Sequence, residues 1–288
     1  MDKVLFIANP LSVKRKGINL ERLIENNLDH TRFSRHIIYT EYHNHAVELA
    51  ETYRSEYRII IAVGGDGTVN QVSQALVAYD NILGLIPLGS GNGLARDLGI
   101  PLKPSRAISR INKLETRIID SGLIGGKHFI NMAGVGFDAE IAHDFANSVK
   151  RGFTGYVFSV IKKFFSYRSR DYKLSIDASV INKNAFLISF ANTGQYGNNA
   201  YISPGAKPDD GLLDICFIKK FPALAAPVLV ARLFLKNINR SKYVEIFRSA
   251  SLSLSSEHKI IGHVDGEPVS FDRELGMEIK EKSLAVIV

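Results

Sequence analysis

Residues 59–70 read Ile59-Ile60-Ile61-Ala62-Val63-Gly64-Gly65-Asp66-Gly67-Thr68-Val69-Asn70. The first five are apolar and mostly β-branched, which is typical of a strand buried on both faces of a parallel sheet. Three glycines lie in the next four positions, and residues 69–79 then have helical spacing. A strand that passes through a glycine-rich turn into a helix is the repeating unit of an open α/β sheet.

The same alternation continues on both sides of this stretch. Apolar runs at residues 4–8, 36–39 and 83–87 have the length of strands, and residues 18–28 and 46–53 have helical spacing. We therefore predict an N-terminal doubly wound α/β domain with a parallel sheet, covering residues 1–118.

The pattern changes near residue 118, and residues 119–288 are predicted to form a mainly β domain. Its last strand can return toward the N-terminal domain. Helices are expected at 155–167 and 222–236. The strand-like runs, separated by glycine-rich turns, lie at residues 129–132, 172–176, 185–190, 212–219, 251–255 and 284–288.

Composition restricts the class of protein further. The 288-residue chain is 45% hydrophobic, which excludes disorder. Its 36 Lys and Arg exceed its 29 Asp and Glu, so an anionic nucleotide, phospholipid surface or nucleic acid is favoured. The single cysteine, Cys216, forms neither an internal disulfide nor a metal pair, which indicates a reducing compartment. We expect no signal peptide and no membrane span, since no apolar run reaches ~20 residues.

The glycine-rich stretch carries the first chemical prediction. Gly64, Gly65 and Gly67 would let backbone N–H groups approach a phosphate, and the following helix N-terminus adds partial positive charge. Asp66 ends a parallel strand, where we expect it to meet magnesium or a hydroxyl. Thr68 offers an N-cap oxygen or a phosphate contact. The alternative is a glycine turn with a capping aspartate.

A second glycine loop, residues 89–96, follows the next strand. It contains Gly89, Ser90, Gly91, Asn92 and Arg96. Its spacing matches neither a Walker A loop nor a GxGxxG fingerprint. Adjacent loops at the ends of neighbouring strands are expected to line one crevice.

Two acidic segments occur late in the chain. Asp265-Gly266-Glu267 lies in a strand-like run, so its carboxylates are expected on one face, where one accepts a hydroxyl proton and the other helps to hold magnesium. A solvated Asp-Gly turn is the alternative. Around Asp210, a tight turn can offer a carboxylate and nearby carbonyls to a hard cation, although such turns also form without metal. Residues 155–173 mix aromatic and basic side chains, as in an interfacial patch or a solvated helix with a buried face.

The two glycine loops, Asn9-Pro10-x-Ser12 and Asp265-Gly266-Glu267 together resemble the diacylglycerol kinase catalytic-domain family, which spans bacterial lipid kinases and the sphingosine and ceramide kinases. The resemblance covers nearly the whole chain in order. It implies an N-terminal doubly wound α/β domain and a C-terminal β-sandwich, with the nucleotide in the cleft between them. Two departures stand out: Val13 where a glycine is common, and Gly93 where bacterial members often have aspartate.

The resemblance also implies roles for individual residues. Glu267 would be the proton acceptor, with Asp265 and Asp66 as further catalytic residues. A structural magnesium site would use Asp210 and the carbonyls of Lys207 and Leu212. The positions that match nucleotide-binding ones are Asn9, Ser12, Lys14, Thr40, Gly64, Gly65, Asp66, Gly67, Thr68, Asn70, Gly89, Ser90, Gly91, Asn92, Arg96 and Asp120.

The implied activity is transfer of the γ-phosphoryl group of ATP, with Mg²⁺, to a lipid hydroxyl of diacylglycerol or sphingoid type. We expect a cytoplasmic protein at the membrane surface that binds no nucleic acid, and leave a homodimer open. One alternative is a kinase of a soluble acceptor such as NAD, which is disfavoured because no Asn-Glu pair follows the first loop. Another is a catalytically silent regulator that binds nucleotide or lipid.

Overall fold

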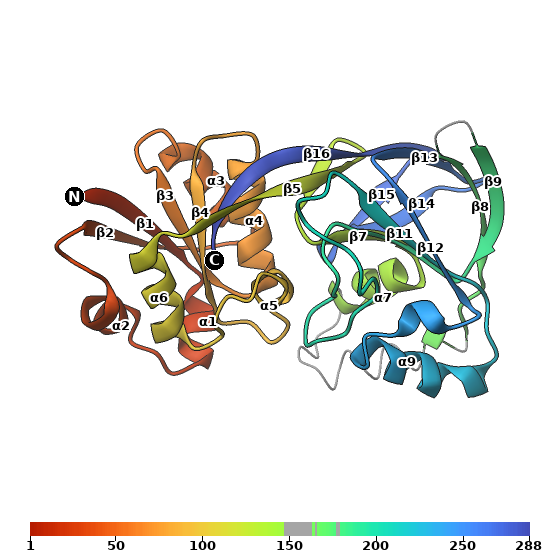
Figure 1. Ribbon diagram of the computed structural model, residues 1–288, viewed down its shortest axis with the longest axis horizontal. Helices are drawn as coiled ribbons and strands as arrows, with labels where there is room; N and C mark the ends of the chain where they lie inside the picture. The colour runs from red at the N-terminus through yellow and green to blue at the C-terminus, as the bar shows by residue number, and fades with distance from the viewer. Residues whose placement is uncertain (147–162, 165, 177–178) are drawn as a thin grey trace. The chain divides into compact units, whose positions relative to one another are not determined.

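The computed structural model describes residues 1–146, 163–164, 166–176 and 179–288 (Figure 1). By its contacts the chain divides into two compact units. Unit 1 comprises Met1–Ser121, Tyr196–Asn199 and Glu281–Val288, and unit 2 comprises Gly122–Gln195 and Ala200–Lys280. The predicted fold class, an α/β domain followed by a β-sandwich domain, is confirmed.

Unit 1 is built on a parallel sheet. The strand order is β2-β1-β3-β4-β16, and each neighbouring pair is parallel. The strands are β1 (Asp2–Ala8), β2 (Phe33–Tyr39), β3 (Ile59–Gly64), β4 (Ile82–Pro87) and the end of β16 (Glu274–Ile287). Every residue of β3 and β4 is buried, as their apolar runs predict.

Helices cover both faces of this sheet (Figure 1). They are α1 (Pro10–Arg15), α2 (Leu20–Asn27), α3 (His45–Tyr53), α4 (Asp66–Leu76), α5 (Gly93–Asp97) and α6 (Pro104–Lys113). Helices α3 and α4 pack together, and α2 packs against α6. Phe6, Ile61 and Ile86 of the sheet share a buried core with Leu20 and Ile108 of the α2–α6 side. The sheet is therefore doubly wound.

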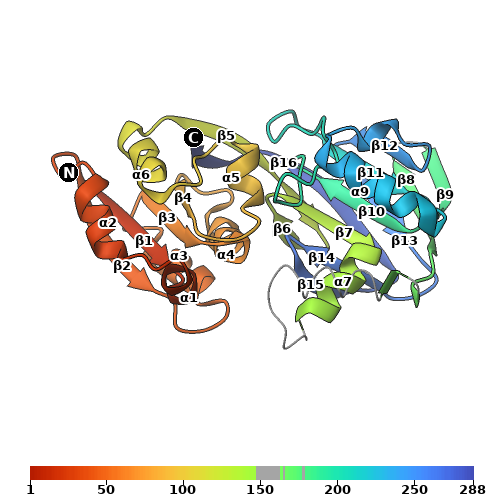
Figure 2. The same ribbon diagram turned by 90° about the horizontal axis from the view of Figure 1, so that it is seen from below.

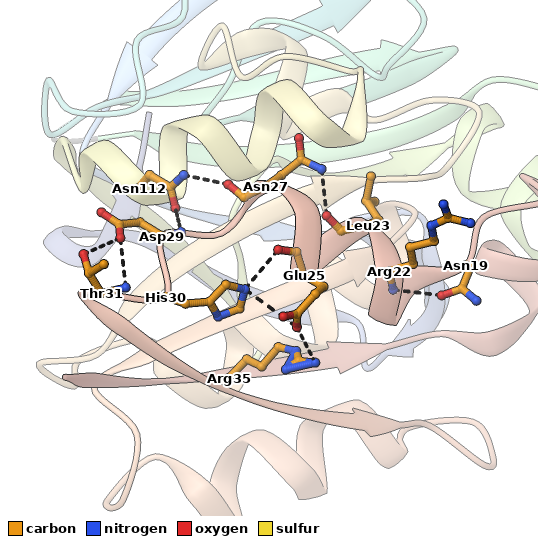
Figure 3. A network of polar contacts seen from close by, with 10 residues as sticks. All are labelled: Asn19, Arg22, Leu23, Glu25, Asn27, Asp29, His30, Thr31, Arg35 and Asn112. Carbon is orange, nitrogen blue, oxygen red and sulfur yellow. Dashed lines mark hydrogen bonds and ion pairs between the residues drawn. The ribbon is translucent and has the colours of Figure 1, made fainter.

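Polar contacts fix the segment that follows α2 (Figure 3). Asn112 of α6 donates from Nδ2 to the carbonyl of Asn27 at 2.7 Å and accepts at Oδ1 from the backbone N–H of Asp29 at 3.0 Å. Glu25 of α2 forms a 2.7 Å ion pair with Arg35 of β2. The amide of Asn112 thus holds together the start of this turn and the end of α6.

Unit 2 consists of two sheets around one core. The first is antiparallel, in the order β12-β11-β10-β7-β14-β15, and the second contains β13, β8 and β9 with the start of β16. Phe129, Phe190, Phe217, Leu254 and Met277 fill the core between them. Strand β5 (Thr116–Ile124) begins in unit 1 and ends in unit 2. The other strands are β6 (Lys127–Phe129), β7 (Met132–Gly136), β8 (Arg170–Ile176), β9 (Ser179–Ala185), β10 (Leu187–Ala191), β11 (Leu213–Ile218), β12 (Val244–Ser249), β13 (Ser251–Ser255), β14 (Ile260–Val264) and β15 (Glu267–Phe271).

The helices of unit 2 lie on the six-stranded sheet (Figure 2). They are α7 (Phe137–Ala146), which contacts β7, β14 and β15, and α9 (Ala226–Phe234) with the short 3₁₀ helices η1 (Ala223–Ala225) and η2 (Ile238–Arg240). Most of the helix predicted at 155–167 lies outside the described residues. The strand predicted at 185–190 is divided, because β9 ends at Ala185 and β10 begins at Leu187. No helix within the described residues is long and apolar enough to cross a membrane.

Candidate active site

The first glycine loop, residues 64–70, joins the end of a strand to the first turn of a helix. Strand β3 ends at Gly64, and α4 begins two residues later at Asp66. A Cβ at Gly64 would lie 2.4 Å from Oγ1 of Thr68, so glycine is needed for close packing. No side chain in the described ranges caps the N-terminus of α4. A helix end without a side-chain cap is suited to binding an anion.

Asp66 connects the two glycine loops. Its Oδ2 accepts a hydrogen bond from the backbone N–H of Asn92 at 2.8 Å, and its Oδ1 accepts one from the N–H of Gly93 at 2.6 Å. The sequence predicted that this carboxylate contacts magnesium or a hydroxyl. It did not predict the two backbone N–H donors. Each carboxylate oxygen has a second lone pair, so Asp66 can still accept from or coordinate a ligand.

Several glycines allow the two loops to touch. A Cβ at Gly89 would lie 2.7 Å from the Cα of Gly65, and one at Gly91 would lie 2.7 Å from Oδ2 of Asp66. Within the second loop, Asn92 has a left-handed backbone (φ 50°) and bonds Gly89 twice, accepting from its N–H and donating to its carbonyl at 2.9 Å each. The side chain of Asn92 thus shapes the loop.

A segment from late in the chain also contacts the second loop. In Tyr196–Asn199, the N–H of Asn198 donates to the carbonyl of Gly91 at 3.1 Å. Arg96 donates from Nε to the same carbonyl at 2.9 Å and from a guanidinium nitrogen to Asn199 at 3.5 Å. The last three residues of the segment have positive φ (117°, 51° and 63°). Sequence reasoning missed this segment, although Gly-Asn-Asn is a recognisable signal for left-handed backbone.

The predicted contacts of the first strand lie at the same edge of the sheet. Asn9 caps α1 by accepting from the N–H groups of Leu11 at 3.0 Å and Ser12 at 3.2 Å. Lys14 is an exposed residue of α1, and Thr40 directly follows β2. Because β1, β2 and β3 are parallel, these residues and the first glycine loop follow the carboxyl ends of adjacent strands.

Asp120 is buried where β5 lies beside the last strand. Its Oδ1 accepts a 2.7 Å hydrogen bond from the backbone N–H of Lys282, a residue with φ 49° in β16. The carboxylate therefore stabilises the left-handed backbone at Lys282. Its predicted part in nucleotide binding stays a prediction.

The acidic pair of unit 2 lies in a hairpin turn. Strand β14 ends at Val264, β15 begins at Glu267, and these two residues pair directly. Asp265 and Gly266 form the connecting turn with φ values of 47° and 86°, as in a two-residue hairpin with positive φ at both positions. The expectation that Asp265 and Glu267 are alternate residues of one strand is wrong. The Asp-Gly pair supplies the residue types that tolerate positive φ.

The Asp265 carboxylate faces the protein rather than solvent. Oδ2 accepts from the backbone N–H of Ile130 at 2.9 Å, and Oδ1 accepts from those of Asn131 at 2.9 Å and Met132 at 2.8 Å. Burial raises the pKa of Asp265 to about 6, because the loss of hydration outweighs the three hydrogen bonds, which act in the opposite direction. The carboxylate thus fixes the chain between β6 and β7 to the hairpin.

A contact between a buried histidine and an aspartate supports the same hairpin. Nε2 of His263 lies 3.2 Å from Oδ2 of Asp138, and the two side chains are 5% and 13% exposed. A Cβ at Gly134 would lie 2.6 Å from both of these atoms. The N–H of Gly266 donates to Nδ1 of His263 at 3.3 Å. Gly134 is thus a position where the strand must pack closely against the side chains of Asp138 and His263. Glu267 is half-buried at the first position of β15.

The turn around Asp210 contains the predicted structural magnesium site. Oδ1 of Asp210 accepts from the N–H of Leu212 at 3.3 Å, and Arg248 lies 3.9 Å from Oδ2. Lys207 is exposed. One carboxylate with backbone carbonyls is a donor set that suits a hard cation, although Arg248 competes for the same carboxylate. Among the described residues, no group of three or more His, Cys, Asp or Glu side chains converges as a metal site.

Comparison with known proteins defines the family. The diacylglycerol kinase catalytic domain model matches residues 3–124, and the YegS C-terminal NAD kinase beta sandwich-like domain model matches residues 131–288. A "Probable lipid kinase YegS-like" protein of Chromohalobacter salexigens is 33% identical, with 73% of this chain and 69% of that protein covered. A diacylglycerol kinase of Bacillus subtilis is 30% identical, with 79% and 80% covered.

Solved structures share the fold. A diacylglycerol kinase from Bacillus anthracis has a TM-score of 0.77 at 22% identity, with 99% of this chain and 96% of that chain covered. An NAD kinase from Archaeoglobus fulgidus, in complex with ATP, has a TM-score of 0.55 at 16% identity, with 100% and 94% covered. The fold and the two family models define a two-domain kinase. The chain belongs to the diacylglycerol kinase catalytic-domain family, whose members include the YegS-like lipid kinases.

Proposed function

We propose that the protein is an ATP- and Mg²⁺-dependent kinase that transfers the γ-phosphoryl group to a lipid hydroxyl of diacylglycerol or sphingoid type. The observation that carries the proposal is the bridge from Asp66 to the N–H groups of Asn92 and Gly93. This bridge holds two glycine loops together at the carboxyl edge of a parallel sheet, beside the uncapped helix end of α4. Open α/β sheets bind phosphorylated ligands at this edge.

The residues of unit 1 would bind and orient the triphosphate. Backbone N–H groups in the first turn of α4 and the exposed hydroxyl of Ser90 supply hydrogen-bond donors, and Lys14 supplies positive charge. Arg96 contributes by fixing the carbonyl of Gly91 in the second loop. Phosphoryl transfer depends mainly on such positioning and on electrostatic stabilisation.

In unit 2, Glu267 would accept the proton of the acceptor hydroxyl. Asp265 acts as a positioning residue, because its carboxylate is engaged by three backbone donors. Asp66 fits a magnesium ion that nucleotide phosphates also coordinate, since such ions need only one or two protein carboxylates. Magnesium would neutralise charge that develops on the phosphates. Asp210, with the carbonyls of Lys207 and Leu212, would hold a second, structural ion.

The test is transfer of radiolabel from ATP to diacylglycerol, sphingoid base, ceramide and monoacylglycerol, with NAD as the soluble acceptor. We expect labelling of one lipid class, its loss with EDTA, and its recovery with added Mg²⁺. Labelling of NAD alone would assign the soluble-acceptor function, for which the NAD kinase resemblance gives support in fold only. Nucleotide binding without transfer to any acceptor would identify a silent regulator. The proposed setting is the cytoplasmic membrane surface, and a homodimer remains open.

A further inference from the structure

Helix α9 has its apolar surface on the outside. Leu229 is the one buried residue of this nine-residue helix. An ordinary surface helix buries its apolar stripe and turns polar residues to water, whereas α9 has apolar residues on its exposed side as well. The exposed apolar side chains of η1, α9 and the residue after it are Leu224, Val228, Val230, Phe234 and Leu235, with exposed fractions of 92%, 57%, 52%, 51% and 68%.

These side chains form a continuous surface, which we call the α9 face. Positions 228, 231 and 235 follow one another at helical spacing, as do positions 227, 230 and 234, and all six are exposed apolar residues or proline. A contiguous exposed apolar patch of this kind marks an interaction site. Isolated exposed apolar residues elsewhere in unit 2, such as Val180, need no such explanation.

The α9 face is held in place by aromatic packing at its start. The ring of Phe221 lies 4.9 Å from that of Phe186, 5.6 Å from that of Phe164 and 6.1 Å from that of Tyr243. At the far end, the carbonyl of Leu233 accepts from the N–H of Tyr201 at 3.0 Å. Contacts at both ends fix the orientation in which α9 presents its apolar residues.

The segment of the chain that carries the α9 face has charges of one sign. Residues 219–243 contain six Lys and Arg and no Asp or Glu. Lys219 pairs with Glu245, whereas Lys220, Lys236, Arg240 and Lys242 are exposed. An apolar helix face with a basic fringe is the pattern of an interfacial helix on an anionic bilayer.

We propose that the α9 face docks on an anionic phospholipid bilayer, with Leu224, Val228 and Phe234 entering the interface and the basic fringe contacting headgroups. The proposal rests on the proposed function only in that a lipid acceptor resides in such a bilayer. A second copy of this chain is the less suitable occupant, because an isologous contact would bring the two basic fringes together.

The aromatic and basic stretch 155–173, predicted from sequence as an interfacial patch, lies largely outside the described residues. Of its described basic side chains, Lys163 pairs with Glu140 at 2.8 Å and with Asp144 at 3.4 Å. Arg170 pairs with the same glutamate at 2.7 Å. These two cations are neutralised within the protein, whereas Arg168 and Lys173 of the same stretch are exposed. Within the described residues, the α9 face combines exposed apolar and basic side chains, so it is the better match to an anionic membrane.

The test is co-sedimentation of the full chain, without nucleotide, with phosphatidylcholine vesicles that contain or lack phosphatidylglycerol. We expect binding to the anionic vesicles and about tenfold weaker binding for Val228→Glu, which places a charge in the apolar face. Val180→Glu in β9 is the matched control, since Val180 is 58% exposed, and its binding should be unchanged. Lys236→Glu should weaken binding to anionic vesicles, and added salt should reduce that difference.

Equal binding of wild type and Val228→Glu would overturn the proposal. A second result would also overturn it: analytical ultracentrifugation shows a wild-type dimer, and Val228→Glu dissociates this dimer but still binds vesicles. That result would assign the α9 face to contact with a second copy of the chain. Phosphorylation of a water-soluble short-chain diacylglycerol separates the two hypotheses. If the proposed function is right, Val228→Glu should retain this activity. If the wild-type protein binds vesicles but phosphorylates no lipid, only the proposed function is refuted.

Discussion

The backbone N–H of Gly93 donates a 2.6 Å hydrogen bond to the carboxylate of Asp66, although 27 positions separate the two residues. The bond is charge-assisted, and such bonds are roughly twice as strong as neutral ones. Asp66 is also the first residue of α4, where a negative charge is favoured by the helix dipole. One carboxylate thus stabilises a helix end and sets the spacing of the two glycine loops.

Asp66→Ala should therefore reduce both stability and activity. The variant leaves the N–H groups of Asn92 and Gly93, both buried residues, without their acceptor, at about 1–3 kcal/mol for each unpaired donor. We expect a lower free energy of unfolding in urea and a loss of phosphoryl transfer of at least about 100-fold. Asp66→Asn keeps one oxygen that can accept one of the two hydrogen bonds, so its stability and activity should lie between those of wild type and Asp66→Ala. Asp80→Ala, at an exposed site after α4, is the control, and wild-type stability of Asp66→Ala would contradict the bridging role.

Gly89→Ala should separate the two loops. The added Cβ would meet the Cα of Gly65 at 2.7 Å, and backbone cannot move aside as a flexible side chain can. We expect a destabilisation of about 1–3 kcal/mol and weaker nucleotide binding, measured by thermal unfolding and by titration with ATP. Gly276→Ala in β16 is the matched control, because no described atom lies within 4 Å of its Cβ position. Equal effects of the two substitutions would show that loop contact is not what requires glycine.

Asp265 should give stability an unusual pH dependence. Burial raises its pKa to about 6, above the value of about 4 in an unfolded chain, so the native state binds the proton more tightly. The contribution of Asp265 to the free energy of unfolding is therefore fully present below pH about 4. It falls by up to about 1.4 kcal/mol per pH unit and is lost above pH about 6. The measurement is urea unfolding of the wild type and of Asp265→Asn between pH 4 and 7. The difference between their free energies of unfolding, followed against pH, reports the titration of Asp265. A difference independent of pH would refute the raised pKa.

The sequence predicted the helices and strands that have a local apolar pattern. It did not predict features that depend on contacts between residues far apart in the chain. The apolar run at 59–63 became β3, but the helix predicted from residue 69 begins at Asp66, because the glycine in its first turn, Gly67, hides the helical signal. At Asp265 the Asp-Gly pair indicated a turn as the alternative to the strand, but the sequence does not show the three backbone donors that turn its carboxylate away from solvent. The bridge from Asp66 to the second loop depends on sheet register, which residue types alone do not specify.

Cys216 should be unreactive in the folded protein. It lies in β11 with no exposed surface, and burial raises the pKa of its thiol because the thiolate would lose its hydration. We expect Ellman's reagent to label no thiol in buffer and one thiol per chain in denaturant. Rapid labelling in buffer would mean that the six-stranded sheet opens locally or that β11 is an exposed strand.

Glu267→Gln should abolish proton acceptance while leaving the fold intact. The amide keeps the shape of the side chain but cannot take the hydroxyl proton, and general bases contribute about 100- to 10,000-fold to rates. We expect kcat to fall within this range with the KM for ATP unchanged, since no ATP contact is assigned to Glu267. The half-buried position of the residue at the start of β15 predicts near-wild-type unfolding in urea. Glu274→Gln, at an exposed site in β16, should retain wild-type activity. A Glu267→Gln enzyme with an undiminished kcat would transfer the proton-accepting role to another group or to water.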